Sequence, residues 1–298
     1  MAEDSTARKD LHEANRRSWN EATRAHNSHK RDQAHFFRTG GSTLFSDEIE
    51  LLGDISGRSL VHLMCNAGQD TLSLARLGAR VLGVDISDEA ITFATALSRD
   101  AGIPARFERT DIYDWLASTD ERFEVAYSSY GAIPWLSDLT SWARGIERVL
   151  VPGGRFILLE FHPMMWVFEE VASPAETPVI DRLRIRSAYS GGIHIADDSG
   201  VSDYVAEAED ALAPQGYQAG IENFINPHAC HAFAWGVEEI VSALIDAGLR
   251  LTCLRDYPYS NGCKPFPLMH DVGEQRWVLP DEFPRVPLML GITVEKPR

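Results

Sequence analysis

The sequence predicts an α/β fold, with a doubly wound, mostly parallel sheet of seven strands, an N-terminal helical lid and an inserted subdomain. Apolar runs that are typical of buried strands alternate with helix-like segments from residue 60 to residue 161. The connections between them are short, as in a sheet whose parallel strands are joined by helices. An acid, Asp85, directly follows the second apolar run. Such an acid is typical of a nucleoside site at the edge of an open sheet.

The first two predicted strands and the turn between them carry the strongest local pattern. Residues 60–64 form an apolar run that ends in the small-residue turn 65–68, and a helix-like segment follows over 70–77. A second apolar run over 81–84 ends at Asp85. Such a turn brings backbone N–H groups and a helix N-terminus to an anionic part of a ligand, and the acid can accept both ribose hydroxyls. The segment therefore predicts a site for an adenosine-bearing cofactor.

The remaining elements continue the alternation of strands and helices. Further strands are expected at residues 105–108, 123–127, 155–161, 249–254 and 288–294. Helices are expected at residues 88–101, 113–116, 139–149 and 237–247. Gly102 and Pro104 end the first of these helices, and Gly248 is suited to cap the last. A Pro-rich loop is expected over 258–287, between the last two strands.

Four regions are expected along the chain. They are a polar tail and helical lid (1–53), a cofactor-binding core (54–161), an insertion that covers the site (162–232) and the C-terminal part of the core (233–298). The tail is expected to be disordered as far as residue 10, and the lid to consist of two helical pieces. The insertion contains five prolines and an acidic stretch, with antiparallel strands expected near 184–189 and 201–205.

Composition and charge exclude several classes of protein. The formal net charge of −16 argues against binding a polyanion over a broad surface, so no nucleic-acid partner is expected. Arg16 and Arg24 alternate with acids such as Glu13 and Glu21, which predicts a salt-bridged helix face. The chain has no run of about 18 apolar residues, no secretory segment and no CxxC spacing among its four cysteines. We therefore expect a cytoplasmic protein that acts on a small molecule and has no membrane partner.

Five motifs follow one another in a fixed order. They are 62–71 (HLMCNAGQDT), 84–87 (VDIS), 109–112 (RTDI), 127–131 (YSSYG) and 148–154 (RVLVPGG). On these motifs the chain resembles the class I S-adenosylmethionine-dependent methyltransferases, and in particular a bacterial small-molecule subgroup, over residues 60–161 and 235–295. The resemblance implies a Rossmann-like methyltransferase fold with S-adenosyl-L-methionine as cofactor and S-adenosyl-L-homocysteine as product. One departure is the first loop, because a single glycine, Gly68, stands where the family usually has an acid and two or three glycines.

Strand positions and the resemblance together imply the cofactor-binding residues. Asp85 is expected to accept the ribose hydroxyls, or alternatively to cap the helix at 88–101, and Ile86 is expected to lie against adenine. Asp111 is expected to accept from the adenine amino group, or else to cap the short helix that follows. Trp19 is expected on a lid over the cofactor, with plain packing as the alternative. The full set is Trp19, Cys65, Asn66, Gly68, Gln69, Asp70, Thr71, Asp85, Ile86, Asp111, Ile112, Ser128 and Ser129.

The transfer of a sulfonium methyl group asks mainly for alignment of the acceptor and exclusion of water. A general base is needed only if the acceptor must lose a proton. His162 follows the fifth predicted strand, and His228 and His231 precede the returning helix, so these three are the candidate catalytic residues. A zinc site at His228 and His231 would need further ligands that are not evident nearby, and no metal is expected.

Large aromatic residues gather in the segments that should roof the substrate site. Those expected to bind the substrate are Tyr130, Trp135, Trp166, Phe168 and Trp235. They predict a pocket for a flat or apolar organic acceptor, such as a natural-product intermediate of secondary metabolism, although each could equally be ordinary core. The sequence leaves open which of O, N or C is methylated and whether the protein is a homo-oligomer.

Two other functions remain open at this point. An NAD(P)-dependent oxidoreductase would use a similar sheet, but the GxGxxG motif is missing after the first strand. A non-methylating S-adenosylmethionine-binding protein or a cyclase of the same fold would keep all five motifs.

Overall fold

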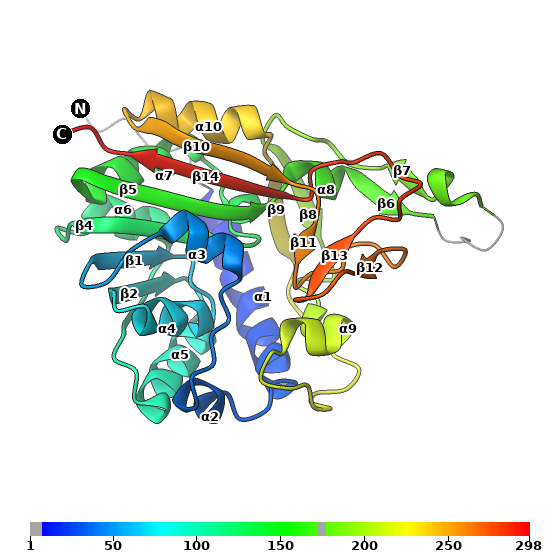
Figure 1. Ribbon diagram of the computed structural model, residues 1–298, viewed down its shortest axis with the longest axis horizontal. Coiled ribbons are helices and arrows are strands. Elements are labelled where there is room, and N and C mark those ends of the chain that lie inside the picture. The colour runs from blue at the N-terminus through cyan, green and yellow to red at the C-terminus, as the bar shows by residue number, and fades with distance from the viewer. Residues whose placement is uncertain (1–7, 172–176) are drawn as a thin grey trace.

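The computed structural model describes residues 8–171 and 177–298, and its centre is a seven-stranded sheet (Figure 1). The strands are β1 (Ser59–Leu63), β2 (Arg80–Asp85), β3 (Arg106–Arg109), β4 (Phe123–Ser129), β5 (Leu150–Phe161), β10 (Arg250–Tyr257) and β14 (Met289–Glu295). Their order is β10-β14-β5-β4-β1-β2-β3. Only β14 is antiparallel to its neighbours. The predicted doubly wound, mostly parallel sheet is confirmed.

Helices cover both faces of this sheet. One face carries α2 (Gln33–Arg38), α3 (Ser46–Leu52), α4 (Gln69–Arg76) and α5 (Asp88–Ala101), and the other carries α6 (Ile112–Ser118), α7 (Leu139–Val149) and α10 (Val237–Asp246). Successive side chains of a strand point to opposite faces. In β1, Leu60 therefore packs with α3 and α4, whereas Val61 and Leu63 pack with α6, α7 and α10. Burial on both faces explains why Leu60, Val61 and Leu63 are all apolar.

The N-terminal region is more ordered and more divided than expected. Helix α1 (Lys9–Ser28) begins inside the stretch predicted to be disordered, so that prediction is wrong for residues 9 and 10, while residues 1–7 lie outside the described part. Three helices, α1, α2 and α3, replace the two expected pieces. Asp32 separates the first two because its side chain accepts the His35 N–H (2.8 Å) and starts α2.

The described part of the insertion contains two pairs of antiparallel strands and short helices. Strands β6 (Phe168–Glu170) and β7 (Leu183–Ile185) pair with each other, and β8 (Ile193–Asp197) pairs with β9 (Cys230–Ala234), which crosses the predicted boundary at residue 232. Helix α8 (Pro163–Val167) opens the region. The strand expected near 201–205 is absent from this described segment, because Asp203 caps α9 (Tyr204–Ala208) by accepting the Ala206 N–H.

The segment 258–287 is not simply a loop. It carries a three-stranded sheet of β11 (Ser260–Asn261), β12 (His270–Asp271) and β13 (Arg276–Val278) at the carboxyl end of β10. The segment therefore lies at the edge of the main sheet where β5 ends. None of the helices in the described residues has the length and apolar character required to cross a membrane.

Candidate functional site

The loop after β1 has an unusual backbone at the carboxyl edge of the sheet. Met64, Asn66 and Gly68 have φ angles of 58°, 48° and 79°, in the left-handed region that non-glycine residues seldom adopt. The Cys65 N–H donates to the Val84 carbonyl (3.0 Å), and the Gly68 N–H donates to the Cys65 carbonyl (3.1 Å). These bonds hold the loop against β2, and Gly68 leads directly into α4.

Gly68→Ala is expected to lower the free energy of unfolding by about 2–3 kcal/mol, as measured by urea unfolding. A Cβ at this position would lie 2.6 Å from Ala94 Cβ and 2.9 Å from the Phe107 ring. Gly102→Ala is the matched control, because Gly102 has a similar φ of 70° but no atom within 4 Å of the Cβ position. The control should lose about 1 kcal/mol. Equal losses in the two variants would contradict the argument from crowding.

Asp85 at the end of β2 ties together the loops that follow β1 and β2. Its Oδ2 accepts the Asn66 N–H (2.8 Å), and its Oδ1 accepts the Ser87 N–H (2.8 Å). Burial raises the pKa of Asp85, although these donors oppose the shift. The cap of α5 is Ser87, whose hydroxyl accepts the Ala90 N–H (3.1 Å). The alternative role considered for Asp85, as a cap of α5, therefore belongs to Ser87.

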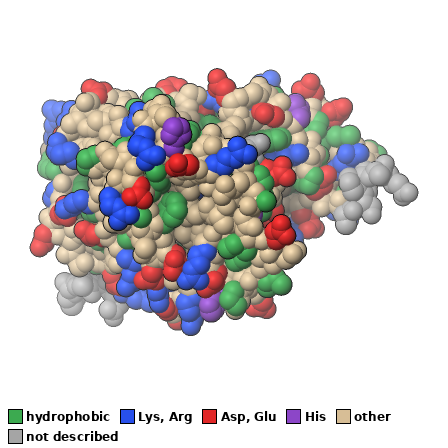
Figure 2. Space-filling model, turned by 90° about the horizontal axis from the view of Figure 1, so that it is seen from below, with side chains coloured by type: hydrophobic (Ala, Val, Ile, Leu, Met, Phe, Trp, Pro, Cys, Tyr) green, Lys and Arg blue, Asp and Glu red, His purple; other side chains and the backbone are tan. Residues whose placement is uncertain are grey.

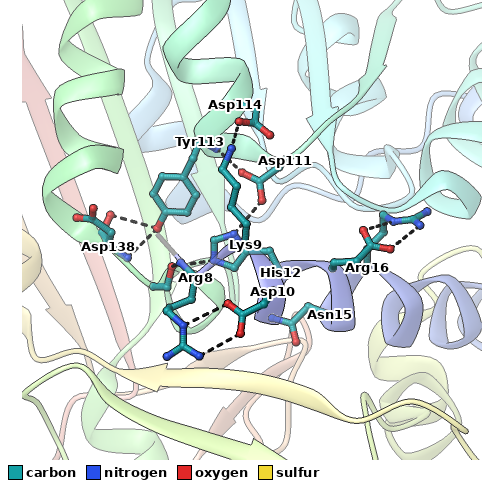
Figure 3. Close-up of polar contacts among 12 residues, drawn as sticks. Arg8, Lys9, Asp10, His12, Asn15, Arg16, Asp111, Tyr113, Asp114 and Asp138 are labelled. Atoms are coloured by element: carbon teal, nitrogen blue, oxygen red, sulfur yellow. Dashed lines mark hydrogen bonds and ion pairs between the residues drawn. The ribbon is translucent and has the colours of Figure 1, made fainter. Parts of the chain in front are cut away.

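Asp111 caps helix α6 and also contacts helix α1. One carboxylate oxygen accepts the Tyr113 N–H (2.8 Å) at the start of α6, and the other lies 2.8 Å from His12 Nδ1 of α1 (Figure 3). Burial acts to raise the pKa of Asp111, but the bonds from His12 and the backbone outweigh it and hold the pKa below its ordinary value. His12 also stacks on the Tyr113 ring, with centroids 5.2 Å apart. His12 was missed in the sequence.

A cavity of about 360 Å³ opens beside Asp111. Its walls come from α1 and from the ends of β2 and β3, through Lys9, Glu13, Arg16, Ile86, Arg109, Thr110, Asp111 and Asp114. Ile86 and Asp111, the two side chains predicted to face adenine, thus face one common space. The volume lies within the range of small-ligand pockets, about 300–1,000 Å³.

Helix α1 joins the core to the insertion. Arg16 pairs with Asp88 of α5, and on the other side the Asn15 side chain donates to the His231 carbonyl (2.8 Å) and accepts its N–H (2.7 Å). The predicted salt-bridged face is confirmed by the pairs Arg16–Glu13 (2.7 Å) and Arg24–Glu21 (2.9 Å). Basic and acidic side chains are likewise interspersed on the face of the molecule shown in Figure 2.

Trp19 lies within an aromatic cluster formed by three parts of the chain. Its ring is edge-on to Trp135 of the 3-10 helix η1 (Ile133–Trp135), at 5.4 Å, and to Tyr204 of α9, at 6.4 Å. Burial raises the pKa of the Tyr204 hydroxyl, and a hydrogen bond with the Asn66 side chain partly opposes this shift. The cluster therefore adjoins the loop after β1.

A second polar group lies where α4 begins. Asp70 accepts a bond from the Thr43 hydroxyl (2.5 Å) and lies 3.5 Å from the Ser129 hydroxyl. Burial raises the pKa of Asp70 and lowers the pKa of Lys30 to about 8, and the attraction between the two opposite charges partly offsets both shifts. Lys30, like His12, carried no signal in the sequence that pointed to the site.

Other predicted cofactor residues have side chains engaged within the protein. The Gln69 amide donates to Gln33 (2.8 Å), the Thr71 hydroxyl lies 2.9 Å from His62 Nδ1, and the Ser128 hydroxyl donates to the Leu63 carbonyl (3.2 Å). The side chains of Cys65 and Ile112 are buried. Any role of these residues in the site therefore falls to their backbone groups.

Glu160, near the end of β5, organises the loop that follows β4. Its Oε2 accepts the N–H groups of Ala132 (2.8 Å) and Ile133 (3.0 Å), and its Oε1 accepts those of Phe161 (2.7 Å) and Gly131. The residue is 1% exposed. One buried carboxylate thus fixes the turn that begins at Tyr130 and carries η1. No sequence motif marked it.

The candidate histidines make different contacts. His162 Nδ1 accepts the Met164 N–H (3.0 Å) as the cap of α8, and its Nε2 lies 3.6 Å from Asp256. His231 Nδ1 of β9 lies 3.1 Å from His194 Nε2 of the exposed strand β8. His228 precedes that hairpin. Among the described residues, no group of three or more His, Cys, Asp or Glu side chains could hold a metal ion.

The aromatic residues predicted for the substrate fall into separate sets. Tyr130 and Trp166 pack against Phe161, at 5.4 Å and 6.0 Å between ring centroids. Phe168 packs in the apolar cluster between α8 and the segment 258–287. Trp235 packs against the main core and donates to the Leu136 carbonyl (2.7 Å). Tyr130 and Trp166 are thus grouped at the end of β5, and Trp135 lies with Trp19.

The sheet order is that of the Rossmann-like fold of class I S-adenosylmethionine-dependent methyltransferases. Residues 61–154 match the sequence model of a family described as "Methyltransferase domain". This segment of the chain is thus similar to a methyltransferase domain. Solved structures of S-adenosylmethionine-dependent methyltransferases from Mesorhizobium loti and Listeria monocytogenes share the fold, each with a TM-score of 0.51. They are 20% and 21% identical in sequence, and the similarity covers 83% and 85% of this chain and 94% and 96% of theirs.

Two curated relatives show similarity in sequence. A ubiquinone biosynthesis O-methyltransferase of Methylobacterium sp. is 28% identical over 161 residues, which are 49% of this chain and 64% of the relative. An uncharacterized methyltransferase of Synechocystis sp. is 30% identical over 132 residues, which are 43% of this chain and 60% of the relative. The match thus spans less than two thirds of either relative.

Proposed function

We propose that this protein transfers the methyl group of S-adenosylmethionine to a small organic acceptor and releases S-adenosylhomocysteine. The observation that carries the proposal is the half-buried carboxylate of Asp85 between two loops, whose chain neighbour Ile86 lines one cavity together with Asp111. A paired acceptor for a ribose diol and an apolar and acidic site for adenine are what an adenosine group requires. The absence of a GxGxxG loop disfavours a dinucleotide.

The charges near α4 fit the methionine end of the same cofactor. Asp70 and the end of β4 at Ser129 offer acceptors for its ammonium group, and Lys30 offers a cation for its carboxylate. Backbone groups of the loop from Gly68 to Thr71 would complete this part of the site. The acid and the base lie close enough to influence each other's pKa, as a zwitterionic ligand requires.

When bound, S-adenosylmethionine supplies a methyl group that its sulfonium already activates for attack. The protein must therefore align an acceptor and exclude water, and alignment alone can lower a barrier by roughly 7–11 kcal/mol. Helix α1 and α9, which meet through Trp19 and Tyr204, cover the loop after β1 and would exclude water there. The aromatic side chains of Tyr130, Trp135 and Trp166 favour a flat or apolar acceptor, such as a natural-product intermediate.

A thermal-shift titration tests the cofactor. Saturating S-adenosylmethionine or S-adenosylhomocysteine should raise the melting temperature, by the linkage between binding and stability, whereas NAD or NADP should not. Stabilisation by NAD or NADP alone would instead support an oxidoreductase. Stabilisation by S-adenosylmethionine without transfer of labelled methyl to any acceptor would support a non-methylating member of the fold.

A further inference from the structure

A buried acid that the sequence motifs did not mark lies at the carboxyl edge of the sheet. Glu48, at the start of α3, is 0% exposed. Its Oε2 accepts the Tyr130 hydroxyl (3.0 Å) and the Phe45 N–H (2.7 Å), and its Oε1 accepts the Tyr127 hydroxyl. Helix α3 runs towards the start of β1, so its N-terminus lies at the edge where the cofactor site is built.

Tyr130 connects this acid to the reacting edge of the sheet. It directly follows β4 with a φ of 30°, in the turn that Glu160 fixes, and it is only partly buried, whereas Tyr127 is 0% exposed. The Tyr130 ring packs against Phe161, and its hydroxyl accepts the Asn261 amide (3.1 Å). A phenol oxygen placed in this way can pass a proton inward to Glu48.

The candidate histidines are less suited to receive a proton. His162 Nδ1 already accepts the Met164 N–H, so its Nε2 carries the proton in the neutral ring and points to Asp256. His231 is paired with His194 of the exposed strand β8. Tyr130 and Glu48 are therefore the better-placed pair.

We propose that Tyr130 and Glu48 form a proton relay for an acceptor that carries an O–H or N–H group, a proposal that rests on the methyl-transfer function above. The acceptor heteroatom forms a bond to the methyl carbon while the S–CH₃ bond breaks and its electron pair remains on sulfur. The proton of the acceptor passes to the Tyr130 oxygen, and the Tyr130 proton passes to Glu48. The carboxylate becomes a neutral acid, which later releases its proton to solvent.

The groups around Glu48 set the pH range in which it can accept a proton. Burial, with a further contribution from the charge of Asp70 on α4, raises the pKa of Glu48 to about 8, although the bonds from Tyr127, Phe45 and Tyr130 oppose the shift. The neighbouring Asp47 is paired with Arg276 of β13 (2.9 Å) and accepts the Tyr259 hydroxyl (2.8 Å). Since the relay requires the ionised carboxylate, kcat should rise with pH and level off above about 8.

The test compares Tyr130→Phe and Glu48→Gln with the control Tyr127→Phe, which also loses a bond to Glu48 but lies away from the reacting edge. Each protein is given labelled S-adenosylmethionine and a panel of phenols, alcohols, amines and one enolisable carbon acceptor. The two relay variants should lose about a hundredfold in kcat and the rising limb of the pH profile, with cofactor affinity retained. The control should keep most of its kcat at high pH and should retain a rising limb, moved to higher pH because the Tyr127 bond that lowers the pKa of Glu48 is lost.

A second readout does not depend on turnover. Infrared difference spectra of the ligand-free protein should show a protonated carboxyl band that falls to half its intensity near pH 8, disappears at higher pH and is missing in Glu48→Gln. Full activity of Tyr130→Phe, the absence of this band, or transfer to the carbon acceptor alone would overturn the relay. Cofactor binding without transfer to any O–H or N–H acceptor in the panel would also count against it. Failure to bind S-adenosylmethionine would instead defeat the proposed function.

Discussion

Glu160→Ala is expected to lower the free energy of unfolding by about 3–5 kcal/mol, because removal of one partner from a buried charged network leaves the others unpaired. Four backbone N–H groups donate to this carboxylate, from Gly131, Ala132, Ile133 and Phe161. Alanine offers them no acceptor, and the side chain is too deeply buried for bulk water to replace it. Urea unfolding followed by circular dichroism measures the loss.

Two further variants separate this effect from general changes in charge. Glu121→Ala removes an exposed carboxylate paired with Arg106 (2.7 Å) and should cost less than about 1 kcal/mol. Glu160→Gln keeps the shape but turns an NH₂ group towards backbone donors, so it should also be destabilised. A loss in Glu160→Ala no larger than that in Glu121→Ala would show that the four bonds do not stabilise the loop.

The fold was largely predictable because its signals are local. The buried strands of a parallel sheet are continuous apolar runs, and the turns between them carry glycine or a capping side chain. The strands of the small sheet at 258–287 are only two or three residues long, and they exist through pairings such as Ser260 with Trp277. Such short pairings leave no periodic pattern in the sequence.

The site was predictable only where a residue follows a strand. Asp85 and Asp111 come after β2 and β3, and the edge of the sheet brings them to one place. His12 meets Asp111 across 99 positions of the chain, and Glu48 meets Tyr130 across 82. Contacts between residues so far apart in the sequence depend on how α1 and α3 pack on the sheet. No local sequence pattern predicts that packing. His162 follows β5 as predicted, and its cap on α8 is a local contact that its place in the sequence did not reveal.

Asp85→Ala is expected to weaken the binding of S-adenosylhomocysteine and S-adenosylmethionine by about a hundredfold. The carboxylate would accept two ribose hydroxyls, and hydrogen bonds to a charged group contribute roughly 1.5–3 kcal/mol each, which corresponds to at least two powers of ten in Kd. The variant would also lose the acceptor of the Asn66 N–H, and this hydrogen bond holds the loop after β1 in its conformation. Both effects act in the same direction on affinity.

Isothermal titration with S-adenosylhomocysteine measures the change, and thermal unfolding establishes that each variant is folded. Asp85→Asn retains an acceptor oxygen without the charge, so its loss of affinity should be smaller than that of Asp85→Ala. Asp100→Ala is the control, because it removes an exposed carboxylate paired only with arginine at the far end of α5. Unchanged affinity in a folded Asp85→Ala protein would show that this carboxylate does not bind the ribose. The main support for an adenosine cofactor at the end of β2 would then be lost.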